Sequence, residues 1–450
     1  MELIGTLGQY IQTKRLAARF HTRQELAGWQ EKQVQKLLRY VLPRSPFYRE
    51  RLGSVQLDEW RTMAPIEKRE MMEHFDRLNT AGIKRDEALR VAEEAEETRD
   101  FTLKIGEVTV GLSSGTSGSR GIFLVGPKER VRWAGAVLAK ALPGPLWEKQ
   151  RVAFFLRANS NLYTSVKRKR LQFAFFDLLI SPEEHVARLQ EYQPTILVAP
   201  PSMLRLLAVA KQEGSFEIRP DKVISVAEVL DPIDEEVIRQ AFGGPVHQIY
   251  QCTEGFLAAT CEHGTLHVNE DILVMEKEYL DETKTRFHPI ITDFSRYTQP
   301  MIRYRLNDVL TERKTPCPCG SVFLALEQIE GRADDVFYFP SAQDAACSAG
   351  SGEKLGPFFP DFVRRAVMTA SPGIEEYIVR QKSPEQVEVS LVISPAYRRE
   401  DAEEEVRRKL RREAERQGYV PPAIAFAPYQ PPERGRKLRR VERMFQPDER

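Results

Sequence analysis

The sequence has 450 residues, of which 42% are hydrophobic and 29% are charged. This length exceeds what one compact core usually holds, so we expect two or three domains in an ordinary folded protein. Lysine and arginine number 66 and aspartate and glutamate 65, so the net charge is close to zero. This balance gives no reason to expect binding to nucleic acid or to a membrane surface.

The cellular compartment can be inferred from features that the sequence lacks. The first twenty residues have no apolar stretch like that of a secretory signal, and no uninterrupted apolar run reaches membrane-spanning length. Five cysteines are an odd number spread over a long chain, which argues against a disulfide framework. We therefore expect a cytoplasmic protein, present as a monomer or a homodimer.

The first 260 residues predict helices followed by an α/β domain. Residues from about 6 to 42 carry apolar side chains at three- and four-residue steps, and residues 85–99 form a charged stretch typical of a solvated helix. From about 102 to 260, short apolar segments alternate with helix-like ones, which indicates a partly parallel sheet. The strand-like segments are FTLKI, VAFFL, TILVAP, KVISVAEVL and VHQIYQC.

The remainder predicts a β-rich part and then a small α+β domain. After Asp335 come two strand-like segments, a charged helix and a last strand, EEYIVRQ, VEVSLVI, DAEEEVRRKLRREAER and AIAFAP. The charges of the helix alternate in sign, so we expect a solvated face and not a nucleic-acid patch. We expect a large N-terminal domain at residues 1–333, β-rich from about 260, and a small mobile C-terminal domain at 334–450.

One segment has the composition of a phosphate loop. Apart from Leu112, the run Gly111-Leu-Ser-Ser-Gly-Thr-Ser-Gly-Ser-Arg-Gly121 consists of glycine, serine, threonine and arginine, and it follows the strand-like VTV. Glycines let successive backbone N–H groups turn toward one anion, and hydroxyls add donors. A flexible surface loop has the same composition, so this loop alone does not establish a phosphate site.

The run resembles the phosphate loop of the adenylate-forming superfamily, which includes acyl-CoA synthetases, peptide-synthetase adenylation domains and luciferases. The family pattern is Ser/Thr-Gly-Thr-Ser/Thr-Gly, often followed by a lysine, and here Arg120 stands at about that place. The resemblance implies that residues 113–118 bind the phosphates of ATP. These residues are Ser113, Ser114, Gly115, Thr116, Ser117 and Gly118.

Further motifs follow in the family's order. Tyr250-Gln-Cys-Thr-Glu254 resembles Tyr-Gly-x-Thr-Glu, where the threonine contacts the α-phosphate and the glutamate holds Mg²⁺. Gln251 replaces the usual glycine. Upstream, Ser225-Val-Ala-Glu228 stands where the family packs a Gly-Gly-Glu segment against adenine, which implies roles for Ala227 and Glu228.

The C-terminal motifs complete the series. Residues 303–308 resemble Tyr-Arg-Thr-Gly-Asp, and residues 331–335 resemble Gly-Arg-x-Asp, so Asp308 and Arg332 would bind the ribose and Asp334 would be the hinge. Residues 435–440 resemble the motif whose lysine enters the active site. Lys437 takes that place, with Arg436 as the alternative.

Other segments resemble the phenylacetate–CoA ligase branch, including its relatives that adenylylate a deazaflavin coenzyme. They are SPFYRERL near the start, Thr265-Leu-His-Val and CPCG. Cys261, Cys317 and Cys319 with His267 offer three thiolates and an imidazole for a structural zinc ion, and His263 competes as the fourth ligand. Cys252 beside Thr253 is interpreted as a small buried residue.

The resemblance implies an enzyme that uses ATP and Mg²⁺ to convert a carboxylic acid into an acyl-adenylate with release of pyrophosphate. Transfer to coenzyme A or another thiol would follow, and no nucleic acid or membrane partner is expected. Two alternatives stay open. One is an adenylyltransferase that leaves AMP on its acceptor, and the other is a catalytically silent nucleotide-binding member.

Overall fold

A computed structural model describes residues 2–53, 55–113, 120–156, 170–342, 355–432 and 437–447. The chain forms two compact units, Met1–Leu306 with Leu310–Gln328, and Asn307–Val309 with Ile329–Arg450. Six residues of the sequence hypotheses lie outside the described residues: Ser114, Gly115, Thr116, Ser117, Gly118 and Arg436.

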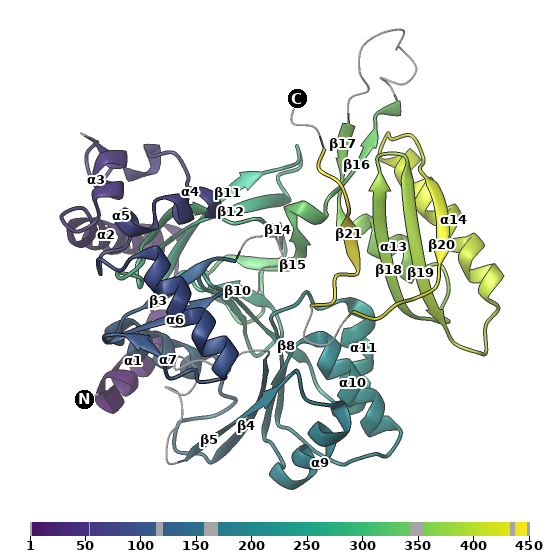
Figure 1. The fold of residues 1–450 in the computed structure, drawn as a ribbon, viewed down its shortest axis with the longest axis horizontal. Helices are drawn as coiled ribbons and strands as arrows, with labels where there is room; N and C mark the ends of the chain where they lie inside the picture. Colours follow the sequence, from purple (N-terminus) through teal and green to yellow (C-terminus); the bar gives the residue numbers. More distant parts are fainter. Residues whose placement is uncertain are drawn as a thin grey trace. The chain divides into compact units, whose positions relative to one another are not determined.

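The first unit begins with a series of helices (Figure 1). They are α1 (Glu2–Ala17), α2 (Arg23–Val41), α3 (Pro46–Leu52), η1 (Trp60–Thr62), α4 (Lys68–Glu73), α5 (Phe75–Leu78) and α6 (Arg85–Thr98). The sequence pattern predicted helix from about 6 to 42, but the helix breaks after Ala17. Thr22 begins a new one, because its extended backbone lets its side chain accept a hydrogen bond from Glu25 N at 3.2 Å. The predicted helix at residues 85–99 is confirmed by α6.

A small antiparallel sheet carries the start of the phosphate-loop segment. Its strands are β1 (Lys104–Ile105), β2 (Val108–Leu112) and β3 (Ile122–Val125), in the order β1-β2-β3. Val110, Ile122 and Leu124 share a buried cluster with Ala88 and Ala92 of α6. Both β2 and β3 are thus packed against α6.

A 12-stranded mixed sheet dominates the first unit among the described residues. Its strand order is β11-β12-β14-β15-β10-β9-β8-β7-β6-β4-β5, and β13 pairs with β12. The parallel half comprises β4 (Gln150–Leu156), β5 (Leu171–Asp177), β6 (Ile196–Ala199), β7 (Lys222–Val226) and β8 (Val246–Cys252). The predicted α/β domain with a partly parallel sheet is confirmed.

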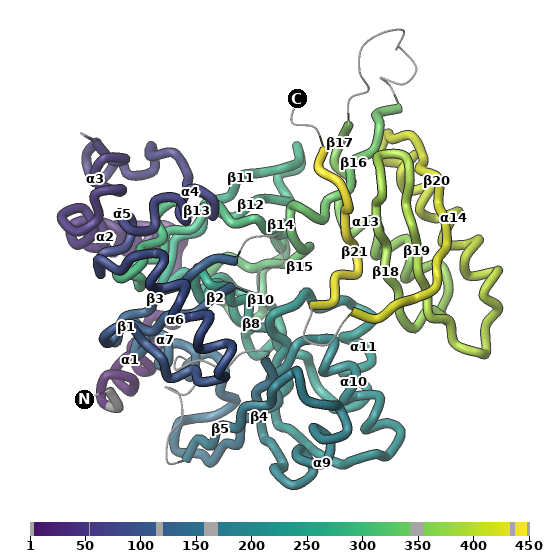
Figure 2. The backbone as a smooth tube through the Cα atoms, viewed as in Figure 1, coloured from purple at the N-terminus to yellow at the C-terminus, as the bar shows by residue number. Residues whose placement is uncertain are grey.

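Helices cover both faces of the parallel half (Figures 1 and 2). On one face lie α9 (Pro182–Tyr192), α10 (Pro201–Gln212) and α11 (Pro232–Phe242), whose Leu189, Leu204 and Ile238 are fully buried. On the other face lies α7 (Pro127–Ala141), and α1 packs along it. The α1–α7 approach is close, since a Cβ at Gly135 would stand 2.6 Å from Gln9 Cβ.

The antiparallel half of the sheet follows β8 in the chain, in agreement with the β-rich part predicted from about residue 260. Its strands are β9 (Gly255–Thr260), β10 (Leu266–Val268), β11 (Leu273–Tyr279), β12 (Arg286–Asp293), β13 (Met301–Arg305), β14 (Asp308–Glu312) and β15 (Ala325–Arg332). The antiparallel β8–β9 pairing turns the chain back at residues 252–255, where the Thr253–Glu254 motif lies.

The second unit has its own sheet and core. It contains η2 (Ala333–Asp335), β16 (Phe337–Pro340), β17 (Leu355–Phe358), α13 (Pro360–Met368), β18 (Ile374–Ser383), β19 (Gln386–Ile393), α14 (Arg399–Arg416), β20 (Ala423–Ala427) and β21 (Val441–Arg443). The sheet order is β20-β19-β18-β21, and α13 and α14 bury Val363, Val367 and Val406 against it. The predicted β-β-α-β series is present, with β21 added beside β18. No described helix is both long and apolar enough to span a membrane.

Candidate functional site

The side chains of Thr253 and Glu254 lie at the turn between β8 and β9. Thr253 Oγ1 donates a hydrogen bond to Glu254 Oε2 at 2.7 Å, and the Tyr304 hydroxyl donates to Glu254 Oε1 at 3.1 Å. Thr253 and Glu254 are half-buried, whereas Tyr304 is only 2% exposed. Two neutral donors therefore orient the carboxylate, one on each oxygen.

Hydrogen bonds of buried polar groups stabilise this turn. Arg296 Nη1 donates to Thr253 O at 2.7 Å, and Arg296 Nη2 donates to Leu124 O at 3.1 Å. Asp293 is 1% exposed and accepts hydrogen bonds from Ser295 N at 2.8 Å and Ser295 Oγ at 2.6 Å. Burial raises the pKa of Asp293 to about 6, although Ser295 and the charge of Arg296 act in the opposite direction.

The residues before the pair have distinct surroundings. Tyr250 is 9% exposed. Gln251 Oε1 lies 3.2 Å from the indole Nε1 of Trp133 on α7, so the residue that departs from the family pattern has a defined partner. Cys252 is half-buried, which corrects the expectation that it is buried, and its Sγ donates to Gly255 O at 3.8 Å.

Ala227 has an unusual backbone conformation directly after β7. Its φ is +70°, and Glu228 N donates to Val226 O at 2.9 Å across it. An L-residue in this region costs about 1–2 kcal/mol, and such residues cluster at ligand sites. The tight turn ends β7 at Val226, earlier than KVISVAEVL predicted. Ser202 N, in α10, donates to Glu228 Oε2 at 3.3 Å and fixes that side chain.

The two ends of the phosphate-loop segment are joined by hydrogen bonds. Ser113 N donates to Gly121 O, and Gly121 N donates to Ser113 Oγ, each at 2.7 Å. Arg120 Nε donates to Ser113 O at 3.2 Å, and its guanidinium also forms an ion pair with Glu96. Arg120, which stands at about the place of the family's lysine, is thus engaged with protein groups at the base of the loop.

The second unit brings together the predicted ribose and hinge residues. Asp308 begins β14, Arg332 ends β15, and Asp334 lies in η2 directly after it. Asn307 Nδ2 donates to Asp334 Oδ2 at 2.7 Å, and Ala333 N donates to Asn307 O at 3.2 Å. The two motif segments, from different parts of the sequence, are therefore hydrogen-bonded to each other.

Lys437 also belongs to the second unit, shortly before β21. Arg439, two residues further on, forms an ion pair with Asp335 and another with Glu442, the latter at 3.0 Å. Burial raises the pKa of Asp335, although the adjacent Arg439 lowers it. These contacts attach the segment after Lys437 to the segment after Asp334.

Three cysteines and one histidine gather within the first unit. One ligand atom from each of Cys261, His267, Cys317 and Cys319 lies within 4.8 Å of the others. Cys261 Sγ is 3.7 Å from Cys317 Sγ, and Cys319 Sγ is 3.4 Å from His267 Nε2. The edges of a tetrahedral zinc site with thiolates are about 3.8 Å long, so these atoms fit such an ion. The side chain of His263 is 47% exposed and lies outside this group.

The backbone orients these ligand atoms. His267 Nδ1 lies 3.2 Å from Phe323 O, an arrangement that assigns the ring proton to Nδ1 and leaves Nε2 available as a ligand. Cys261 and Cys317 each begin a turn, closed by Gly264 N at 3.0 Å and Gly320 N at 3.1 Å. Both glycines have positive φ, +75° and +71°, which these tight turns require.

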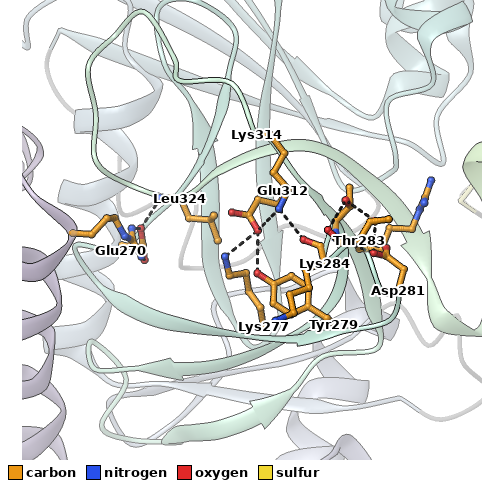
Figure 3. Close-up of polar contacts among 12 residues, drawn as sticks. Glu270, Lys277, Tyr279, Asp281, Thr283, Lys284, Glu312, Lys314 and Leu324 are labelled. Atoms are coloured by element: carbon orange, nitrogen blue, oxygen red, sulfur yellow. Dashed lines mark hydrogen bonds and ion pairs between the residues drawn. The ribbon is translucent and has the colours of Figure 1, made fainter.

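Polar contacts anchor the segment between β14 and β15 that carries Cys317 and Cys319 (Figure 3). On one side Glu312 accepts from Lys277 Nζ at 2.9 Å and from the Tyr279 hydroxyl at 3.2 Å. On the other side Leu324 N donates to the buried Glu270 Oε2 at 2.6 Å. Both ends of the cysteine segment are thus tied to the sheet.

Solved structures share this fold. A 2-hydroxyisobutyryl-CoA ligase in complex with 2-HIB-AMP has 17% identity and a TM-score of 0.67, covering 93% of this chain and 90% of that one. The same ligase with 2-HIB-AMP and CoA has 18% identity and a TM-score of 0.53, covering 94% and 91%. An anthranilate CoA ligase bound to anthranoyl-AMP has 12% identity and a TM-score of 0.51, covering 73% and 66%.

The chain has the adenylate-forming ligase fold. The sequence-based resemblance is confirmed at the level of this fold. Among curated proteins, indoleacetate–lysine synthetase of Pseudomonas savastanoi is 26% identical over 138 residues, which are 30% of this chain. The match spans about a third (34%) of that relative. No protein-family model matches the chain.

Sequence reasoning missed several residues that build the site within this ligase fold. Tyr304, Arg296 and Trp133 contact the motif residues from positions far along the chain. Two sequence signals were available: Tyr304 stands within residues 303–308, which resemble a family motif, and tyrosine and tryptophan usually need a hydrogen-bond partner when buried.

Proposed function

We propose that this protein activates a carboxylic acid with ATP and transfers the acyl group to coenzyme A or another thiol. In the first step a carboxylate oxygen attacks the α-phosphorus of ATP, and the bond to pyrophosphate breaks. The observation that carries the proposal is the Thr253–Glu254 turn at the end of β8, held by Tyr304 and Arg296. It lies in a fold shared with ligases solved with acyl-adenylates.

The first unit positions the phosphates. The Thr253 hydroxyl contacts the α-phosphate, and the loop that begins at Ser113 supplies backbone N–H groups to the outer phosphates. The attacking carboxylate is already ionised at neutral pH, so the step needs no general base. Orientation and charge stabilisation are what the protein contributes.

Glu254 is the residue that would hold Mg²⁺. Its two oxygens each accept one hydrogen bond, from Thr253 and Tyr304, and a carboxylate has about four acceptor positions, so capacity for a cation remains. Magnesium, when bound, neutralises charge on the phosphates. The chemistry of the carboxylate therefore fits this hard cation.

The adenosine would bind to the residues that the adenine and ribose motifs indicate. Ala227, Glu228 and Tyr250 flank the adenine, consistent with the strained turn at Ala227 after β7. Asp308 accepts hydrogen bonds from the ribose hydroxyls, and Arg332 donates to the same sugar. Both side chains are half-buried residues at strand ends.

Lys437 would carry the positive charge that the adenylation step requires. It bridges the substrate carboxylate and an oxygen of the AMP moiety, and it is withdrawn when the second unit rotates about Asp334. The boundary between the two units at Gln328 and Ile329 lies a few residues before Asp334, which supports a hinge near this point. Such a domain motion is a natural candidate for the slow step.

Cys261, His267, Cys317 and Cys319 would hold a structural zinc ion. The argument is their mutual distances and the backbone contact of His267. Zinc would stabilise the fold and take no part in the reaction. We further propose that the protein resembles the phenylacetate–CoA ligase branch. It would be located in the cytoplasm and be present as a monomer or a homodimer.

Two other functions remain as outcomes of the test. An adenylyltransferase would retain AMP on its product, and a silent family member would bind ATP without turnover. We propose to measure ATP–pyrophosphate exchange across aryl, fatty and amino acids, with and without coenzyme A. Acid-dependent exchange, with AMP released on adding coenzyme A, is the expected result. Absence of exchange with every acid, from protein that binds ATP, would overturn the ligase proposal.

A further inference from the structure

Trp133 and Gln251 form a side-chain pair beside the Thr253–Glu254 turn. Trp133 lies on α7, and Gln251 lies on β8 two residues before Thr253. The indole Nε1 is 3.2 Å from Gln251 Oε1. The pair bridges the helix on one face of the parallel sheet to the strand that carries the motif.

The partner of Gln251 fixes the orientation of its amide. An indole N–H is only a donor, so the amide atom that faces it must be the oxygen. Gln251 Nε2 therefore points away from Trp133 with two N–H donors. The structure records no acceptor for Nε2 among the described residues. A half-buried amide held in one orientation is a defined hydrogen-bond donor.

The surroundings of this donor are apolar. Trp133 packs in a cluster with Phe256 and Ile249, and Ile249 lies two residues before Gln251 on the same face of β8. Leu156 and Ala227, near the carboxyl ends of β4 and β7, are half-buried on that face. Ligands of open α/β sheets bind at the carboxyl ends of parallel strands. An organic group lying there would meet apolar side chains and one amide donor.

We propose that Gln251 Nε2 donates a hydrogen bond to an acceptor on the acid substrate, and that Trp133 holds the amide in the orientation that this requires. This inference rests on the proposed function. The acid is then largely apolar and carries one acceptor besides its carboxylate, such as a hydroxyl, a carbonyl or a ring heteroatom. The family pattern has glycine at this place, so the shared reaction itself needs no side chain here. Gln251 is accordingly a specificity-determining residue, and Trp133 is its positioning residue.

The test compares matched acids of equal size that differ only in the acceptor. ATP–pyrophosphate exchange gives kcat/KM for each acid with the wild type, Gln251→Ala and Trp133→Phe. The wild type should prefer the acid with the acceptor by at least about tenfold, because a polar site rejects analogues that leave its donor unpaired. Gln251→Ala should lose this preference, and Trp133→Phe should lose most of it, while activity with the plain acid persists.

Gln248→Ala is the matched control, since Gln248 lies on the same strand and its side chain points to the opposite face. It should keep the wild-type preference. Equal loss with both acids in Gln251→Ala, or an unchanged ratio, would overturn the inference. Calorimetry gives the ratio of the binding affinities of the two acids without turnover, and the wild type should again favour the acid with the acceptor. A protein that shows no exchange therefore still tests Gln251, separately from the ligase proposal.

Discussion

The Tyr304 hydroxyl donates a hydrogen bond to the Glu254 carboxylate over 3.1 Å, although the two residues are 50 positions apart in the chain. Tyr304 lies on β13, and β13 pairs with β12 in the large sheet. Burial, and then the charge of Glu254, raise the pKa of Tyr304 well above its usual value. The hydroxyl therefore remains protonated at neutral pH, where it donates to the carboxylate proposed to bind Mg²⁺.

Tyr304→Phe should weaken the response of the enzyme to Mg²⁺. Partners that orient a metal ligand typically contribute 10- to 100-fold in metal affinity, so we expect the Mg²⁺ concentration for half-maximal exchange to rise about tenfold. The control is Tyr48→Phe, which removes a buried hydroxyl that donates to Pro300 O at 2.8 Å and does not touch Glu254. An unchanged Mg²⁺ dependence in folded Tyr304→Phe would show that Tyr304 has only a structural role.

Zinc analysis tests the thiol cluster. Purified protein should contain about one zinc ion per chain, because three thiolates and an imidazole satisfy a tetrahedral site. Cys319→Ser should lose most of this zinc and lower the midpoint of thermal unfolding, since the proposed ion would join the β9–β10 turn to the segment before β15. Cys252→Ser, outside the cluster, should retain its zinc. Wild-type protein that takes up no zinc from excess metal would contradict the site.

Asp293 predicts a pH dependence of stability. Its pKa is raised from 3.8 to about 6 in the folded protein, so the folded state binds the proton more tightly than the unfolded chain. The stabilisation is complete below about pH 4 and is lost as pH rises through 6. Asp293→Asn should remove this dependence and stabilise the protein at pH 7 by up to about 3 kcal/mol. Its amide oxygen can still accept the hydrogen bonds of Ser295.

Asp281→Asn is the control of opposite sign. Hydrogen bonds from Thr283 and two backbone N–H groups lower the pKa of Asp281, although its partial burial acts in the other direction. This carboxylate stabilises the folded state at neutral pH and loses that effect as pH falls. Urea unfolding at pH 3, pH 5 and pH 7 measures both variants, since the effect of Asp281 is lost only below its ordinary pKa of 3.8. Destabilisation of Asp293→Asn at pH 7 would show that the charged form is favoured after all.

The fold class was predictable because local patterns agree with the tertiary structure. The alternating apolar segments predicted β4, β6 and β8 close to their observed bounds. The sequence pattern also predicted the order of β18, β19, α14 and β20. The break in the first helical region was missed, although Thr22 followed by Glu25 has the spacing of a capping box. Pro46 begins α3, with Ser45 as the cap.

The contacts that build the site could not be predicted from motifs. Tyr304 reaches Glu254 only because β12, β13 and β8 belong to one sheet, and strand pairing over such separations has no local signal. The thiol cluster was anticipated from residue types, but the choice between His263 and His267 required coordinates. His267 lies on β10 facing Cys319, while His263 lies in an exposed turn.

Lys437→Ala separates the two half-reactions. The lysine lies in the second unit, and the pair between Arg439 and Asp335 attaches the segment after it to the proposed hinge. Removing its charge should abolish adenylate formation, whereas thioester formation from supplied acyl-adenylate should remain largely intact, because in the proposed mechanism that step begins after Lys437 has withdrawn. Lys382→Ala is the control, since it removes an exposed lysine of the same unit that pairs with Glu388 at 3.0 Å. Loss of both half-reactions in folded Lys437→Ala would argue against domain rotation as the basis of the second step.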